Sequence, residues 1–208
     1  MEIEIWSDVT CPFCYIGKHN FELALQQVRA PHSINVRWRS FELDPHAAKD
    51  YPGTLYDWLA TRYGKTLEQV VEMNKPIIQH AASLGLIFNL DRVRPTNSFD
   101  AHRLLHAAAT DKKEWLLANG FFKAFFTEGK NISDHAVLLD IAMHSGLQKD
   151  YILDVLQSDK FEKEVKADEK EARQLAIRGV PYFLINRRSF VSGSQPVDVF
   201  LKILQQSS

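Results

Sequence analysis

The sequence predicts an α/β fold that a large all-helical block interrupts. Three observations support this prediction: residues 2–38 read as strand, helix and strand, residues 54–178 carry hardly any strand pattern, and residues 179–208 read as strand, strand and helix. No repeat or low-complexity linker separates these parts, so the helical block is expected to be an insertion within one compact body. We divide the chain into two halves of an α/β body, residues 1–45 and 161–208, and a helical insertion, residues 46–160.

Two short segments near the N-terminus have the alternation of a β-strand. Residues 2–7 place Ile3 and Ile5 on one face, and residues 34–38 repeat the pattern through Val36. Alternation with a period of two residues is typical of strands. Both segments are therefore predicted to be strands.

The segment between these two strands predicts a helix. Pro12 suits the first turn of a helix, and Pro31 blocks its continuation. Apolar side chains recur between the two prolines at helical spacing, at Phe13, Ile16, Phe21, Ala24 and Val28. The chain therefore opens as strand, helix and strand.

The middle of the chain carries the boundary signals of several helices. Thr66 and Gln69 have the spacing of a capping box ahead of an apolar run that ends at Gly85, and Ser133 precedes another run that ends at Gly146. Further helices are expected over residues 97–110, 114–128 and 161–178. This part is predicted to be helical throughout.

The chain changes character after residue 178. Residues 179–186 are predicted to form a strand that is entered through a proline, Asn186 and Arg187 suit a turn, and residues 189–192 form a short return strand. Pro196 then opens a last helix with an apolar face. The chain therefore closes as strand, strand and helix.

Composition and charge exclude several function classes. The 208 residues are 45% hydrophobic and 25% charged, which is typical of an ordinary globular protein, and the net charge of -1 gives no general attraction to nucleic acid or anionic lipid. No stretch approaches the roughly 18 apolar residues of a membrane-spanning helix. The N-terminus lacks the basic start and apolar run of an export signal. We therefore expect a cytoplasmic protein without nucleic-acid or membrane partners.

Cys11 and Cys14 are the only cysteines in the chain. Cytosolic thiols are mostly kept reduced, so a close pair is more typical of catalysis, redox sensing or metal binding than of a structural disulfide. If the first helix starts at Pro12, Cys11 occupies its cap, where free backbone amides and the helix dipole stabilise a thiolate. Cys11 is then the nucleophile, and Cys14, one turn further in and less acidic, resolves the mixed disulfide. Pro12 and Phe13 tune the pair, and because Phe13 offers neither charge nor hydrogen bond, moderate oxidising power is expected.

Two other interpretations of the cysteines stay open. The pair could be buried and inert, although a cysteine that caps a helix beside proline is an odd choice for filling a core. The cysteines could also bind zinc with His102 and His106, which are one turn apart on a predicted helix. The gap between Cys14 and His102 is far longer than in compact zinc modules, so we expect no metal.

The sequence does not identify the group that accepts the proton of Cys14. Glu4, Asp8 and a later lysine are candidates, but no spacing rule selects among them. Asn97 could reach the active-site groove from the helical part, although a helix cap is the simpler interpretation.

Residues 7–17, 179–183 and 192–196, in this order, resemble the DsbA-like branch of the thioredoxin superfamily, and within it the FrnE-type group. The resemblance implies a thioredoxin fold with a helical insertion and the activity of a protein-disulfide oxidoreductase or isomerase. It also implies that the Val180–Pro181 bond is cis and that this loop lies against the cysteines, where its backbone binds an extended substrate. No cofactor is required for this exchange.

The same family leaves alternatives open. Some relatives act on glutathione or isomerise chromene carboxylates, with a serine in place of the first cysteine, so Cys11 argues against that branch. Glutathione remains a substrate or reductant beside protein disulfides and dithiols. A non-enzymatic, redox-switched binding or chaperone-like protein is the other alternative. The sequence does not define the physiological substrate, the direction of electron flow or the oligomeric state.

Overall fold

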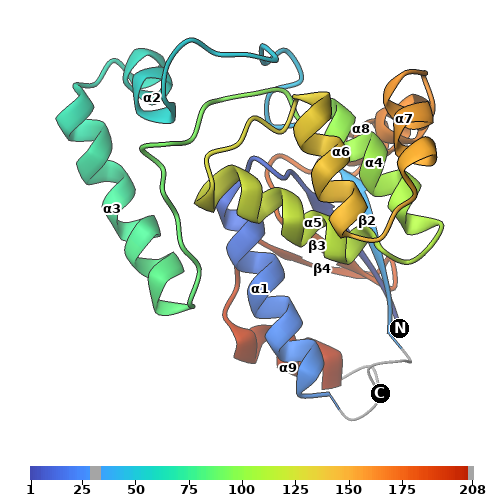
Figure 1. The fold of residues 1–208 in the computed structure, drawn as a ribbon. Coiled ribbons are helices and arrows are strands. Elements are labelled where there is room, and N and C mark those ends of the chain that lie inside the picture. The colour runs from blue at the N-terminus through green and yellow to red at the C-terminus, as the bar shows by residue number, and fades with distance from the viewer. Residues whose placement is uncertain (29–33, 206–208) are drawn as a thin grey trace. The chain divides into compact units, whose positions relative to one another are not determined.

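The computed structural model describes residues 1–28 and 34–205. The chain forms two compact units, and Figure 1 shows the helices and strands of both. The first unit contains Met1–Leu43 and Glu162–Ser208, and the second contains Asp44–Phe161. The predicted stop of the first helix at Pro31 lies outside the described residues, and the helix itself ends at Gln26.

The described part of the first unit has a four-stranded sheet in the order β2-β1-β3-β4. β1 pairs in parallel with β2 and antiparallel with β3, and β3 pairs antiparallel with β4. The strands are β1 (Glu2–Ser7), β2 (Asn35–Ser40), β3 (Tyr182–Ile185) and β4 (Ser189–Ser192), and the helices are α1 (Pro12–Gln26), α8 (Glu162–Gln174) and α9 (Val197–Gln205). The predicted thioredoxin-like order, strand-helix-strand and then strand-strand-helix, is confirmed.

Helices cover both faces of this sheet. On one face, Phe21 of α1, Phe183 of β3 and Phe200 of α9 meet with ring centroids 4.7 to 5.5 Å apart. On the other face, Trp6 of β1 packs with Ala172 of α8. Aromatic side chains bury large apolar areas, so these contacts hold the helices on the sheet.

The central strand β1 is buried on both faces. Ile3 and Ile5 share a face, as the alternation indicates, but Glu4 between them is also only 1% exposed. The Oε1 atom of Glu4 lies 3.0 Å from Nε of Arg39 and 2.8 Å from Nη2 of Arg187. Because a buried charge is costly unless it is paired, these two arginines allow an acidic residue inside the sheet.

Every residue from 44 to 161 is described, and none of them lies in a strand. The elements of this second unit are α2 (Leu55–Tyr63), α3 (Leu67–Ser83), α4 (Phe99–Ala109), α5 (Glu114–Phe122), the π-helical turn η2 (Lys123–Thr127), α6 (His135–His144) and α7 (Lys149–Leu156). The prediction of an all-helical insertion is therefore confirmed. No helix in the described part of the chain is long and apolar enough to span a membrane.

The starts of α3 and α6 lie where the sequence signals place them, to within one residue. Thr66 and Gln69 form the predicted capping box of α3. Ser133 does not cap α6, because the adjacent Asp134 accepts the hydrogen bond from the backbone N–H of Ala136 at 2.8 Å. Ser133 and Asp134 both have side chains that can cap a helix. Asp134 is the N-cap, where its carboxylate also faces the positive end of the helix dipole.

Three predicted helices have different ends. The helix expected over residues 114–128 becomes a wider π-helical turn after Phe122. The one expected over residues 161–178 ends at Gln174, shortly before Ala176 adopts a left-handed conformation with φ of 55°. The one expected from residue 97 begins at Phe99, whose N–H donates to the side chain of Asn97.

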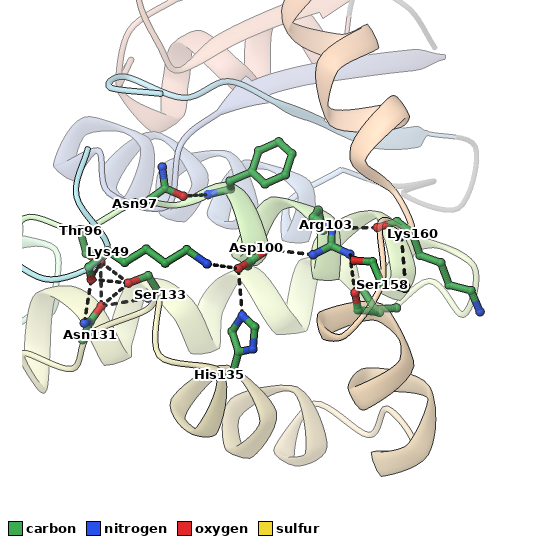
Figure 2. A network of polar contacts seen from close by, with 12 residues as sticks. Lys49, Thr96, Asn97, Asp100, Arg103, Asn131, Ser133, His135, Ser158 and Lys160 are labelled. Atoms are coloured by element: carbon green, nitrogen blue, oxygen red, sulfur yellow. Dashed lines mark hydrogen bonds and ion pairs between the residues drawn. The ribbon is translucent and has the colours of Figure 1, made fainter. Parts of the chain in front are cut away.

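A buried polar network connects α4, α6 and the end of α7 within the second unit (Figure 2). The carboxylate of Asp100 lies 2.8 Å from Nη1 of Arg103, 3.2 Å from Nζ of Lys49 and 3.0 Å from Nε2 of His135. Burial acts to raise the pKa of Asp100, but the hydrogen bonds from these three partners outweigh it and lower that pKa. Arg103 also donates to main-chain oxygens in the last turn of α7 and just after it, at Val155, Ser158 and Lys160.

Candidate functional site

The cysteine pair lies at the start of α1, as predicted. Cys11 is the N-cap residue in an extended conformation, with φ of -93° and ψ of 117°, and Pro12 is the first helical residue. The backbone oxygen of Cys11 accepts hydrogen bonds from the N–H groups of Cys14 and Tyr15, at 3.1 and 3.3 Å. The helix therefore begins between the two cysteines and places both thiols at its positive end.

Asp8 shapes the turn that leads into this helix. Its side chain accepts hydrogen bonds from the N–H groups of Thr10 and Leu43, at 3.0 and 2.8 Å, and its main-chain oxygen accepts one from Cys11 at 3.1 Å. Asp8 is 1% exposed. These hydrogen bonds stabilise the turn that precedes Cys11.

Both thiols are free, and Cys14 is the more deeply buried of the two. Burial raises the pKa of Cys14 most, and the hydrogen bond and charge of Cys11 raise it further. The Ser7 hydroxyl and the Asp8 backbone act in the opposite direction. Cys14 is therefore a protonated thiol at neutral pH. When Cys11 is covalently engaged, its charge is lost, which removes one of the effects that keep Cys14 protonated.

The loop before β3 lies beside Cys11. The Val180–Pro181 bond is cis, as the resemblance implied, and Sγ of Cys11 lies 3.7 Å from the main-chain oxygen of Val180. The structure thus brings Cys11, Cys14, Val180 and Pro181 together within the first unit.

Phe13, between the cysteines, points to the outside. Its side chain is 50% exposed, while Pro12 is partly buried. A phenyl ring supplies no hydrogen-bond donor, so Phe13 adds apolar surface next to Cys11 rather than a partner for its sulfur.

Sequence reasoning missed the residues that pack beneath the Val180–Pro181 loop. A Cβ atom on Gly17 would lie 2.8 Å from Cγ of Pro181, so only glycine fits here without movement of the proline ring. Asn20, one turn further along α1, donates from Nδ2 to the main-chain oxygen of Gln195 at 2.9 Å. Gly17 lies within residues 7–17, which carried the resemblance, but the sequence gives no signal for its contact with Pro181, because the two residues are far apart in the chain.

Of the suggested proton acceptors for Cys14, Glu4 is engaged by two arginines and Asp8 by loop amides. Lys18 is the lysine nearest to Cys14 in sequence, one helical turn later, and its side chain is 2% exposed. Burial lowers the pKa of Lys18 to about 8, and the carboxylate of Glu22, 2.7 Å away, acts in the opposite direction.

His102 and His106 belong to α4 of the second unit, and the cysteines belong to the first. Within the described parts of the chain, no group of three or more His, Cys, Asp or Glu side chains is arranged to hold a metal ion. Asn97 also lies in the second unit, and its side-chain oxygen accepts from Phe99, the start of α4, at 2.9 Å.

Comparisons with known proteins agree with this fold. The family model of the DSBA-like thioredoxin domain matches residues 2–205. The chain is 28% identical to the uncharacterized protein YwbO of Bacillus subtilis, over 98% of this chain and 96% of that protein. The crystal structure of the probable DsbA oxidoreductase SCO1869 from Streptomyces coelicolor has a TM-score of 0.91 and 37% identity, covering 100% of this chain and 89% of that one. The cytosolic disulfide reductase DsbM from Pseudomonas aeruginosa, solved with GSH, has a TM-score of 0.69 and 16% identity, covering 100% and 98%.

Proposed function

This chain belongs to the DSBA-like thioredoxin domain family and is a general thiol-disulfide oxidoreductase, and we propose that it exchanges disulfides with protein or glutathione substrates through Cys11 and Cys14. The observation that carries this proposal is the asymmetry of the two thiols. Cys11 caps α1, whereas Cys14 lies within the first turn of the helix, is the more deeply buried of the two and is held protonated. In this proposal Cys11 attacks the substrate, and Cys14 reacts only after the mixed disulfide has formed.

The exchange proceeds in two steps. The Cys11 thiolate attacks one sulfur of a substrate disulfide, which forms a mixed disulfide and releases the other substrate sulfur as a thiolate. Cys14 then loses its proton and attacks Sγ of Cys11. A Cys11–Cys14 disulfide forms, the second substrate sulfur leaves as a thiolate, and both released thiolates take up protons. Two electrons have passed to the substrate. The reverse sequence oxidises a substrate dithiol.

The Val180–Pro181 loop is the proposed binding site for the segment that carries the substrate cysteine. The main-chain oxygen of Val180 lies beside Cys11, so a substrate chain running past the sulfur can hydrogen-bond to this backbone. Phe13, two residues after Cys11, is exposed and offers the substrate an apolar contact. Backbone recognition of this kind tolerates many substrate sequences.

Glutathione is the proposed small-molecule partner. Two glutathione thiols reduce the Cys11–Cys14 disulfide and leave as one glutathione disulfide, so no resident cofactor is needed. The structure of DsbM with GSH supports glutathione as a partner, and its description as a cytosolic reductase supports a cytoplasmic location for this chain. A glutathione-dependent isomerase without disulfide exchange is a weaker alternative, because Cys11 would then be dispensable.

Trapping of mixed disulfides tests the proposal. The Cys14→Ser variant is incubated with cell extract, quenched with acid and N-ethylmaleimide, and analysed by mass spectrometry for adducts on Cys11. Proteins or glutathione should accumulate on Cys11 because Cys14 is no longer present to release them.

The double variant Cys11→Ser, Cys14→Ser is the matched control and should trap nothing. If Cys14→Ser forms no adduct while a known oxidoreductase does so in the same extract, the proposed function is wrong. If Cys11→Ser still converts a small electrophile with glutathione at the wild-type rate, the isomerase alternative replaces it.

A further inference from the structure

A short turn after β4 fastens the Val180–Pro181 loop from behind. The N–H of Gly193 donates to the main-chain oxygen of Pro181 at 2.8 Å, and the N–H of Gln195 donates to the oxygen of Gly193 at 3.0 Å. We call residues 193–195 the 193–195 turn. Because this turn holds the carbonyl of Pro181, its position determines the position of the loop.

Helix α1 in turn holds the 193–195 turn. Nδ2 of Asn20 donates to the main-chain oxygen of Gln195 at 2.9 Å. At Gly17, one turn earlier, a Cβ would lie 3.4 Å from Cα of Ser194 and 2.8 Å from Cγ of Pro181. The helix that carries both cysteines therefore contacts both the turn and the proline.

Asn20 is an unfavourable residue for the stability of the fold at this position. It lies inside a helix, where asparagine is a poor helix former, and it is only 2% exposed. Its Oδ1 atom has no hydrogen-bond partner among the described residues. Burying an amide with one unsatisfied polar atom costs free energy that an apolar side chain would not. The hydrogen bond to the main-chain oxygen of Gln195 is the one specific interaction that the buried amide makes among the described residues.

We propose that Asn20 is a positioning residue for substrate binding. Through the oxygen of Gln195 it fixes the 193–195 turn, and through the N–H of Gly193 this turn fixes Pro181, so that the backbone of Val180 stays in register with Cys11. Asn20 itself touches no substrate. This inference rests on the proposed function. It assigns to Asn20, one helical turn after Gly17, the alignment of the Val180–Pro181 loop with Cys11.

The test compares an extended substrate, which needs the loop, with a small one, which does not. The reduced protein is mixed in single turnover with a synthetic ten-residue peptide whose central cysteine is disulfide-bonded to glutathione, or with bis(2-hydroxyethyl) disulfide. For Asn20→Leu, the half-saturating peptide concentration should rise about fivefold, the effect of one lost hydrogen bond. The maximal rate, and the rate constant with the small disulfide, should stay within about twofold of wild type.

Asn89→Leu is the matched control. Asn89 also donates from Nδ2 to a main-chain oxygen, that of Thr127 at 2.7 Å, but in the second unit. This variant should react like wild type with both substrates. If Asn20→Leu binds the peptide as wild type does, or slows both substrates by the same factor, the inference is wrong. If wild type itself reacts with neither substrate, the proposed function fails.

A second variant covers the case in which Asn20→Leu does not fold. Gly17→Ala pushes directly on Pro181 and should show the same difference between peptide and small disulfide. Its control is Gly120→Ala in α5, where an added Cβ would lie 2.7 Å from Cγ2 of Ile141. Circular dichroism establishes that each variant is folded. A folded Gly17→Ala variant with unchanged peptide binding would contradict the inference.

Discussion

Sγ of Cys11 lies 3.7 Å from the main-chain oxygen of Val180, although the two residues are 169 positions apart in the chain. The contact joins the first strand-helix-strand segment to the last strand-strand-helix segment, both in the first unit. Under the proposed function, this contact places the sulfur that reacts beside the backbone that binds the substrate.

The first prediction concerns the proton of Cys14. Its pKa is raised by burial and, secondarily, by Cys11, so Cys11→Ser should lower the pKa of Cys14 and still leave it above the ordinary value of 9.0. Cys14 should then react with iodoacetamide slowly at neutral pH and faster only as the pH rises above that value. The measurement is the alkylation rate between pH 6 and pH 11 in Cys11→Ser.

Cys14→Ser reports Cys11 in the same assay and serves as the comparison. Rapid alkylation of Cys14 at pH 7 in the Cys11→Ser variant would show that burial does not control this thiol. It would also remove the physical basis for assigning Cys14 the resolving role.

The sequence predicted those parts of the site that local rules determine. The spacing of Cys11 and Cys14 and the position of Pro12 were enough to place the helix cap, because each depends only on neighbouring residues. The position of Val180 beside Cys11 came from the family resemblance, since no local pattern connects residues so far apart. The bond between Asn20 and Gln195 was not predicted, because it depends on how α1 packs on the turn after β4.

The errors in the fold have similar causes. Ser133 and Asp134 are both good capping residues, and the difference of one position depends on the path of the incoming chain. The burial of Glu4 had no signal in the sequence, because its partners Arg39 and Arg187 lie on other strands or turns, and Arg187 is at the other end of the chain. Hydrophobic periodicity predicts which elements exist, whereas their exact ends and ion pairs depend on tertiary contacts.

The second prediction uses the buried ammonium of Lys18. Burial lowers its pKa to about 8, so between this value and about 10.5 the unfolded chain binds a proton that the folded protein does not. The free energy of unfolding should therefore rise with pH in wild type relative to Lys18→Met. Between pH 7 and pH 10 the relative gain should be about 2 kcal/mol.

Urea denaturation of both proteins at these two pH values measures this difference. Parallel pH profiles would mean that Lys18 titrates normally and that water reaches its amine.

The third prediction concerns the network around Asp100 (Figure 2). Arg103→Met removes a buried ion pair and three hydrogen bonds to main-chain oxygens, which should lower the free energy of unfolding by about 3 kcal/mol. Lys49→Met removes the exposed partner of the same carboxylate and should cost much less. Thermal and urea unfolding of the two variants provide the comparison.

Asp100 also predicts a direction for the pH dependence of stability. Its pKa is lowered in the folded protein, so the stabilisation that it provides is present above its ordinary value of 3.8 and is lost as the pH falls through the folded value. Arg103→Met should therefore show a weaker loss of stability with acid than wild type. Equal losses in the two proteins would place the acid-sensitive interaction elsewhere.

The last prediction concerns Phe13, whose ring is 50% exposed and gives Cys11 no hydrogen bond. In Phe13→His, a ring N–H or a positive charge next to the sulfur should stabilise the Cys11 thiolate, and with it the reduced form of the pair. The reduction potential should therefore rise, which makes the protein a stronger oxidant. Equilibration with mixtures of reduced and oxidised glutathione measures it, and Phe13→Leu, which changes the shape of the side chain but adds no donor, should stay close to wild type. If Phe13→His and Phe13→Leu shift the potential equally, packing around the cysteines controls it, and the absence of a donor at residue 13 is not what limits the oxidising power.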